Sequence, residues 1–224
     1  MEVTITKSNK KRVLTPTWER MDPLSSLHPT AQRILQASRR ILVERGLSGL
    51  TFDAIARESG QYKGSISYFF GDKETLIAML ADLVGHDAVA VARERLNALP
   101  PGRERVHEAI AVNEQVSRND EDFVVFLDIA AQALRVERLK ERIAGLYEDY
   151  RAINRAMLDS SAEHGGAPDI ERLATLSLAL ADGLSLQHAL DPAGFDPGPY
   201  WTFWEELVVQ RLGGSPASEG RETS

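Results

Sequence analysis

The sequence contains no cysteine, and that absence removes several kinds of chemistry at once. Disulfide bonds, thiolate metal sites and cysteine nucleophiles all need the missing side chain. No apolar run approaches the roughly 20 residues that cross a bilayer, and the N-terminal segment lacks the apolar core of a signal peptide. These absences predict a cytoplasmic protein with no membrane partner.

Motifs of catalysis and metal binding are missing too. The patterns H-E-x-x-H, G-x-S-x-G and G-x-x-x-x-G-K-[ST] do not occur. The five histidines, at positions 28, 86, 107, 164 and 188, lack the spacing of metal ligands. The acidic stretch after Asn119 lacks the spacing of a calcium loop and is better explained as a helix cap. We therefore expect neither an enzyme nor a bound metal or cofactor.

Charge is unevenly distributed along the chain. Residues 1–80 hold 12 basic and 8 acidic side chains, whereas residues 81–224 hold 14 and 25. Only the N-terminal part therefore suits a polyanion. It begins with a segment without periodicity, residues 1–27, which we expect to be a flexible arm. The arm carries a basic cluster, and it is either a solvated tail or a contact to phosphates; the cluster is Lys7, Lys10, Lys11 and Arg12.

From Pro29 onward, apolar residues recur three and four positions apart, which is typical of amphipathic helices. No alternating strand pattern and no internal repeat is present. The sequence therefore predicts an all-α fold. The first helix should end at Gly46, and another should begin after an Asp72 cap. Further helices are expected at residues 52–59, 62–69, 103–117, 121–133, 136–163, 169–190 (capped by Asp169) and 199–212.

Two short predicted helices, residues 52–59 and 62–69, meet at Gly60. Such a pair matches the helix-turn-helix arrangement, whose second helix enters the major groove of DNA. A glycine between two short helices is often only a turn, and single exposed lysines and serines are usually solvated surface. The three-helix pattern, taken together with the residues of the third helix, favours DNA binding.

The third helix has an apolar side and a polar side. Ile66, Phe69 and Phe70 are expected to pack on the first two helices. Lys63 can donate to guanine or to a phosphate, and Gly64 allows the backbone to approach DNA. Hydroxyl side chains supply short donors, and helix N-termini suit phosphates. The predicted DNA-contacting residues are Thr51, Gln61, Tyr62, Lys63, Gly64, Ser65, Ser67, Tyr68 and Lys73.

Residues 30–77 resemble the DNA-binding domain of the TetR/AcrR family of bacterial transcriptional regulators. The resemblance rests on the runs D-x-I-A-x-x-S-G, which begins at residue 53, and K-G-S-I-S-Y-F-F-x-D-K-E-T-L, which begins at residue 63. It implies that Thr51 and Lys73 hold phosphates. It also implies direct contacts to DNA from Tyr62, Lys63, Ser65 and Tyr68.

Three positions depart from the family's pattern. Gln61 stands where a small hydrophobic residue is usual, Tyr62 replaces Ser or Thr, and Phe69 replaces His or Tyr. Because Gln61 and Tyr62 lie at the helix end that points at bases, we expect them to influence this protein's sequence preference.

The resemblance also implies a C-terminal helical bundle that dimerises. Helices 169–190 and 199–212 are apolar enough to form a two-fold four-helix interface, although the same stripes could fill the core of one chain. The predicted interface residues are Leu173, Ser177, Leu180, Ala181, Leu184, Phe203, Trp204, Leu207 and Val208.

A small-molecule effector site is expected inside that bundle, again through the resemblance. Its candidate lining residues are His107, Phe123, Phe126, Gln132, Tyr147, Tyr150 and His188. The chain then divides into the arm, a helix-turn-helix domain (28–75), an effector-binding and dimerisation domain (76–212) and a disordered tail (213–224).

The predicted function is a dimeric transcriptional regulator of the repressor type. It would bind a palindromic double-stranded DNA operator and leave it when an effector binds. The alternative is a helical scaffold protein that coats DNA without effector control.

Overall fold

The structure is a computed structural model that describes residues 27–99, 102–159 and 167–213 of the chain. These residues form helices and no strand, which confirms the all-α prediction. The predicted arm and tail lie almost entirely outside the described residues. The helices are α1 (Pro29–Gly49), α2 (Phe52–Ser59), α3 (Lys63–Phe70), α4 (Lys73–Ala98), α5 (Arg103–Ser117), α6 (Asp120–Ala133), α7 (Glu137–Asp159), α8 (Ala167–Leu190) and α9 (Gly198–Gly213).

Most helix boundaries in the N-terminal part follow from capping residues. Thr51 accepts a hydrogen bond from the backbone N–H of Ala54 at 3.1 Å, which begins α2. Gly60 has φ 67° and ψ 21°, the left-handed conformation that ends a helix at low cost for glycine. Asp72 accepts from the N–H of Thr75 at 2.7 Å and begins α4. The predicted cap at Asp72 and the predicted break between two short helices at Gly60 are confirmed.

The predicted helix end at Gly46 is confirmed, because Gly46 leaves the helical conformation with φ 63° and ψ -174°, and the turn up to Gly49 that α1 includes follows this break. One predicted boundary was wrong. Asp169 is not the cap of its helix, because α8 begins at Ala167 and places Asp169 in its first turn. The predicted end of the helix at residues 136–163 falls partly outside the described residues, and α7 is described to Asp159.

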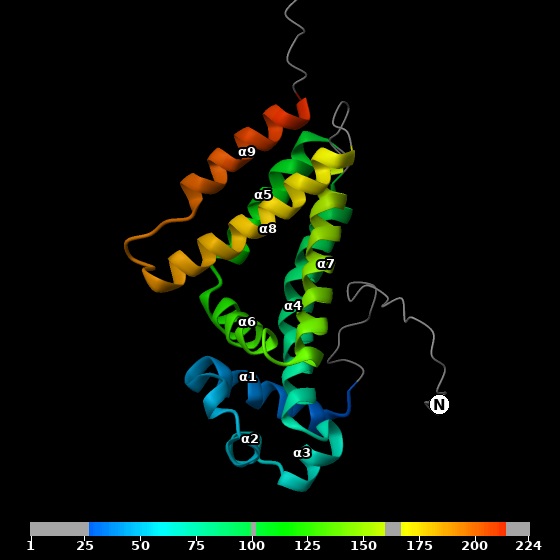
Figure 1. Ribbon diagram of the computed structural model, residues 1–224, viewed down its shortest axis with the longest axis vertical. Coiled ribbons are helices and arrows are strands. Elements are labelled where there is room, and N and C mark those ends of the chain that lie inside the picture. Colours follow the sequence, from blue (N-terminus) through cyan, green and yellow to red (C-terminus); the bar gives the residue numbers. More distant parts are fainter. Residues whose placement is uncertain (1–26, 100–101, 160–166, 214–224) are drawn as a thin grey trace, which may run out of the picture.

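The helices form an elongated molecule with the short helices at one end (Figure 1). Helices α1 to α3 form that end, and α4 runs from them alongside α7 toward the other end. Helix α6 lies between α1 and the C-terminal helices, while α5, α8 and α9 occupy the far end. Among the described residues, no helix is long and apolar enough to span a membrane.

The apolar core near α1 to α3 extends beyond these three helices. Ile34, Ile55 and Ile66 are fully buried and belong to one apolar cluster with Leu80 of α4 and Ile129 of α6. Burial of such side chains stabilises the folded state by about 1.5–3 kcal/mol each. Because this cluster also includes residues of α4 and α6, a displacement of either helix must change how α1 to α3 pack.

Candidate nucleic-acid interface and ligand cavity

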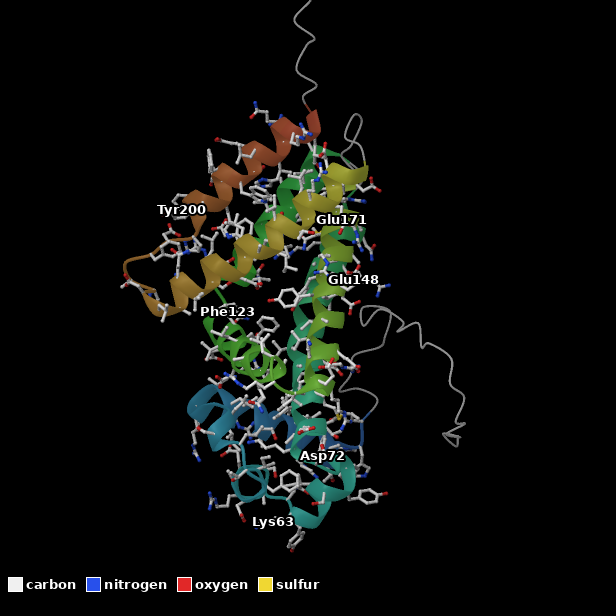
Figure 2. The ribbon with its side chains drawn as sticks, viewed as in Figure 1. Lys63, Asp72, Phe123, Glu148, Glu171 and Tyr200 are labelled. Atoms are coloured by element: carbon white, nitrogen blue, oxygen red, sulfur yellow. The ribbon has the colours of Figure 1, made fainter. Side chains whose placement is uncertain are left out.

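Helix α3 is anchored by one apolar side. Ile66 is fully buried and Phe70 is 3% exposed, and both belong to the cluster that contains α1 and α2. Phe69 is partly buried, and its ring stacks on His28 with ring centroids 5.3 Å apart. These contacts fix the orientation of the opposite side, at the end of the molecule where Lys63 lies (Figure 2).

The opposite side of α3 presents polar groups and large rings to solvent. Tyr62 is 87% exposed and Tyr68 is 83% exposed, although tyrosine rings are usually half-buried in folded proteins. Ser67 is exposed as well, and a side chain built at Gly64 would meet no atom within 4 Å. Gln61 and Ser65 are partly exposed. The ring of Tyr68 packs edge-on against Phe69 with ring centroids 5.0 Å apart, while Tyr62 lies at the N-cap of α3. Two exposed tyrosine rings on a short, firmly anchored helix and its cap form a surface that fits a groove.

Lys63 is the first residue of α3, and it forms an ion pair with Asp53 in the first turn of α2. A cation at a helix N-terminus is unfavourable for the helix dipole, so the carboxylate offsets that cost. Both side chains are more than half exposed, which keeps the pair weak. Sequence reasoning missed Asp53, although an acidic residue two positions after Thr51 was visible.

The two predicted phosphate-binding residues are placed differently. Thr51 is exposed beside the N-terminus of α2, where its hydroxyl already serves as the cap. Lys73, in the first turn of α4, donates from Nζ to the backbone carbonyl of Leu47 at 2.9 Å. An ammonium has three donors, so this bond leaves others for a phosphate. Lys73 therefore also links the start of α4 to the end of α1.

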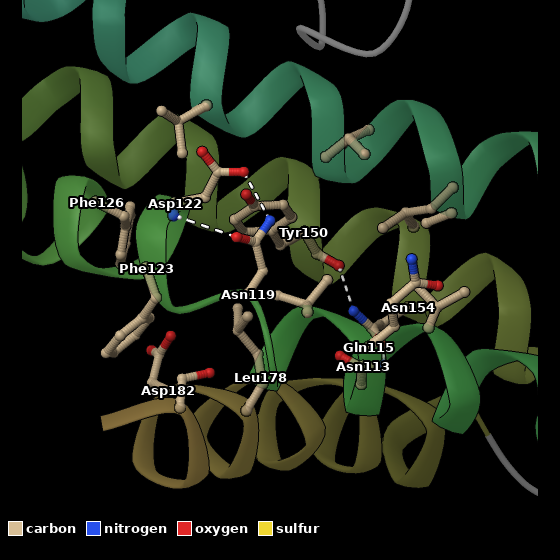
Figure 3. Close-up of a pocket in the computed structure, with 18 of the residues that line it drawn as sticks. Asn113, Gln115, Asn119, Asp122, Phe123, Phe126, Tyr150, Asn154, Leu178 and Asp182 are labelled. Atoms are coloured by element: carbon tan, nitrogen blue, oxygen red, sulfur yellow. Dashed lines mark hydrogen bonds between the residues drawn. The ribbon is translucent and has the colours of Figure 1, made fainter. Parts of the chain in front are cut away.

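A second candidate site is a cavity of about 240 Å³ between α4, α5, α6, α7 and α8. Its wall is mainly apolar and includes Leu178 of α8 and Met157 of α7. Two carboxylates, Asp122 and Asp182, also line it (Figure 3). At one end Asn113 donates from Nδ2 to Oδ1 of Asn154 at 3.0 Å. Sequence reasoning did not single out these carboxylates or amides, because their neighbours come from distant helices.

Three predicted effector residues line this cavity, namely Phe123, Phe126 and Tyr150. Tyr147 is not in the wall, but its hydroxyl donates to Asp182 Oδ2 at 2.8 Å. The remaining three predicted residues lie outside the cavity wall. His107 and Gln132 are exposed, and Nδ1 of His107 lies 2.9 Å from Oε1 of Glu205. Nδ1 of His188 lies 2.8 Å from the carbonyl oxygen of Phe195.

The pKa values of Asp182 and Tyr147 are both raised, mainly because the two side chains are half-buried. Burial raises the pKa of Asp182, and the hydrogen bond from Tyr147 opposes that shift. Burial also raises the pKa of Tyr147, with the charge of Asp182 as the second cause. A carboxylate that has lost hydration and keeps one neutral donor favours a cation nearby.

The predicted dimer residues divide by burial. Leu173, Ser177, Ala181, Leu184 and Val208 are buried inside one chain, where α8 and α9 both pack on α5. Leu180 and Trp204 are half-buried, and Trp204 donates from Nε1 to Ser177 at 2.9 Å. Phe203 and Leu207 are exposed. The exposed apolar face of α8 and α9 consists of Leu176, Leu186, Leu190, Tyr200, Phe203 and Leu207.

These features define a class of protein: a helix-turn-helix protein with a separate internal cavity in its C-terminal helices. Comparison with known families agrees. Residues 34–80 match the family described as bacterial regulatory proteins, tetR family, and residues 100–213 match the BetI-type transcriptional repressor C-terminal domain. The chain belongs to the TetR family of transcriptional regulators, with a C-terminal domain of the BetI type, and it is a DNA-binding protein.

Individual relatives and structures are consistent with this assignment. The chain is 29% identical over 177 residues to the regulator BetI of Rhizobium meliloti (strain 1021), covering 76% of this chain and 84% of BetI. A putative transcriptional regulator from Pseudomonas aeruginosa PAO1 superposes with a TM-score of 0.71 at 25% identity, over 85% of this chain and 95% of that one. A putative regulator from Saccharomonospora viridis, solved with choline, has a TM-score of 0.69 at 19% identity, over 81% and 96%.

Proposed function

We propose that the protein is a homodimeric repressor that acts in the bacterial cytoplasm and leaves its operator when a small molecule fills the cavity. The observation that carries the proposal is the anchored α3 helix, whose Lys63, Ser67 and two tyrosines point outward. Lys63 and its neighbours would contact bases, with Lys73 and Thr51 on phosphates. One such helix reads few base pairs, so two related by a two-fold axis would read a palindrome.

The exposed apolar face of α8 and α9 supports dimerisation. Its six large side chains are between 39% and 77% exposed. On α8, Leu176, Leu186 and Leu190 share the exposed side with Gly183, where a side chain would meet no atom within 4 Å. Several large apolar side chains exposed along one side of a helix are typical of interfaces, and a two-fold axis would pair α8 and α9 with their copies.

The chemistry of the cavity favours a small organic cation as effector. The half-buried carboxylate of Asp182 supplies negative charge, and the rings of Phe123, Phe126 and Tyr150 can contact a cation. Pockets for drug-sized molecules are on the order of 300–1,000 Å³, so a cavity of about 240 Å³ fits a smaller molecule. The choline bound to the Saccharomonospora viridis structure is a cation of this class.

The test starts from selection of bound duplexes out of a random DNA library. The selected sequence should be a palindrome that binds one dimer or a pair of dimers, and choline as probe should lower its affinity. Extended coating without sequence preference, unaffected by choline, would instead support the scaffold alternative. A palindrome that choline does not release would retain the regulator and reject this class of effector.

A further inference from the structure

Asp122 belongs to two parts of the molecule at the same time. It lies in the first turn of α6, and its carboxylate lines the ligand cavity. Its Oδ1 forms an ion pair with Arg39 of α1, inside the DNA-binding end. Its Oδ2 accepts from Nδ2 of Asn119, the N-cap of α6, at 2.7 Å (Figure 3). With 25% of the Asp122 side chain and 36% of the Arg39 side chain exposed, solvent screens this pair less than a surface pair.

Helix α6 holds α1 at a second point about two turns further along. Asp128 Oδ2 accepts from the backbone N–H of Leu47 at 3.1 Å, next to the break at Gly46. The carbonyl of Leu47 in turn accepts from Lys73, in the first turn of α4, three residues after the end of α3. A shift of α6 therefore acts on α1 at both contacts, and through Leu47 on the segment that follows α3, the recognition helix of the proposed function.

We propose that the Asp122–Arg39 ion pair couples the cavity to the recognition helix. This inference rests on the proposed function and names the contact through which it is regulated. A cation in the cavity competes with the Arg39 guanidinium for the Asp122 carboxylate. When the ligand wins, α1 loses its charged contact with α6, and α3 changes its distance from the copy in the partner subunit. A ligand shifts such an equilibrium only by its difference in affinity for the two arrangements, and a shared carboxylate supplies that difference.

Two variants remove the ion pair with little change of shape, namely Asp122→Asn and Arg39→Gln. The matched control is Arg40→Gln, which breaks the 2.9 Å pair between Arg40 of α1 and Glu58 of α2 within the DNA-binding end. Affinity is measured on the duplex selected by the wild-type protein. Spacing of the recognition helices is measured between spin labels on a Glu74→Cys background, which carries one label per subunit because the chain has no cysteine.

Both variants should lose operator affinity by on the order of 5-fold or more, and the double variant should lose no more than the worse single variant. The label distance should change in both variants, whereas Arg40→Gln should leave it unchanged. Affinity and label distance equal to those of the wild-type protein would overturn the proposal, even if the melting temperature fell, because the pair would then be merely structural. If Arg39→Gln fails to fold, Arg39→Lys keeps the charge and should show a smaller loss.

Choline as probe separates this inference from the proposed function. It should shift the label distance of the wild-type dimer and produce no further shift in Asp122→Asn. An equal shift in both proteins would overturn the role of Asp122. No shift in either protein would contradict the cationic effector, and the operator affinities of the variants would then decide the role of the ion pair by themselves. A wild-type protein that selects no DNA sequence would reject the proposed function and this inference together.

Discussion

At the scale of single residues, Lys63 and Asp53 show how the proposed DNA-binding surface can hold an acidic group. The carboxylate compensates a cation at the start of α3 while the protein is free, yet it lies where phosphates would approach. If α3 contacts DNA as proposed, Asp53 should oppose binding to any DNA that does not offer a base donor, such as the cytosine amino group, at that point.

Replacement of Asp53 by Asn should relax specificity rather than strengthen recognition of one sequence. Without the carboxylate, Lys63 is free to contact phosphates on any duplex, so affinity for random DNA should rise more than affinity for the selected operator. The ratio of the two affinities, measured at one fixed salt concentration, checks this expectation. A ratio as large as that of the wild-type protein would show that Asp53 has no part in selection.

Asp182 gives the second prediction at this scale. Its pKa is raised in the folded protein above the ordinary 3.8, so stability falls as pH rises through the raised value, and the loss persists at neutral pH. Asp182→Asn removes this loss. The melting temperature of Asp182→Asn minus that of the wild-type protein should increase as the pH is raised from 4 to 7. Choline should bind the variant more weakly than it binds the wild-type protein. A difference in melting temperature that is flat across this range would contradict the role assigned to burial.

At the scale of helices, the packing of α4 on α7 depends on a glycine. A side chain built at Gly85 of α4 would lie 2.1 Å from Cδ1 of the buried Leu146 of α7, and 3.0 Å from its Cγ. The whole Leu146 side chain would have to move, or the two helices would have to separate. Helix α4 runs from the cavity to helices α1 to α3, so the contact between Gly85 and Leu146 helps to fix the position of α4 against α7.

Gly85→Ala should therefore destabilise the protein, and Gly145→Ala is its matched control. The control site lies on α7 and would meet no atom within 4 Å, so it gains only the helix preference of alanine. Gly85→Ala should be less stable than Gly145→Ala by about 1–3 kcal/mol, as measured by urea unfolding. Equal stabilities of the two variants would mean that α4 and α7 accommodate the methyl group without cost.

The features of the helices that could be predicted from the sequence are those set by residues close together in the chain. The starts of α2 and α4 follow from Thr51 and Asp72, whose side chains cap the next turn within four residues. The anchoring of α3 by Ile66 and Phe70 follows from their spacing. Contacts between distant helices carry no such local signal. The pairing of Arg39 with Asp122 joins residues 83 positions apart and was not visible in the sequence.

At the scale of the whole molecule, the apolar face of α8 and α9 lies at the opposite end from α3 (Figure 1). A dimer formed there would leave both copies of α3 free to contact one duplex. It would also make their spacing depend on the long path through α4 and α6. In the proposed dimer, small shifts at the cavity would thus change the distance between two distant helices.

Phe203→Asp should produce a monomer, because a charge would be buried at the centre of the proposed interface. Phe203 is 61% exposed in the single chain, so the fold itself should be unaffected. Leu134→Asp is the control, since Leu134 is 80% exposed at the end of α6, away from this face. Sedimentation velocity should give a monomer for the first variant and a dimer for the second. A stable dimer of Phe203→Asp would reject this face as the interface.

The most direct test of the central claim is a titration of the selected palindromic duplex with wild-type protein and with Lys63→Ala. If α3 reads DNA through its exposed side, the variant should lose about 1–3 kcal/mol of operator binding free energy, with an unchanged melting temperature because Lys63 lies outside the core. Operator affinity equal to that of the wild-type protein would contradict the claim that this side of α3 contacts DNA.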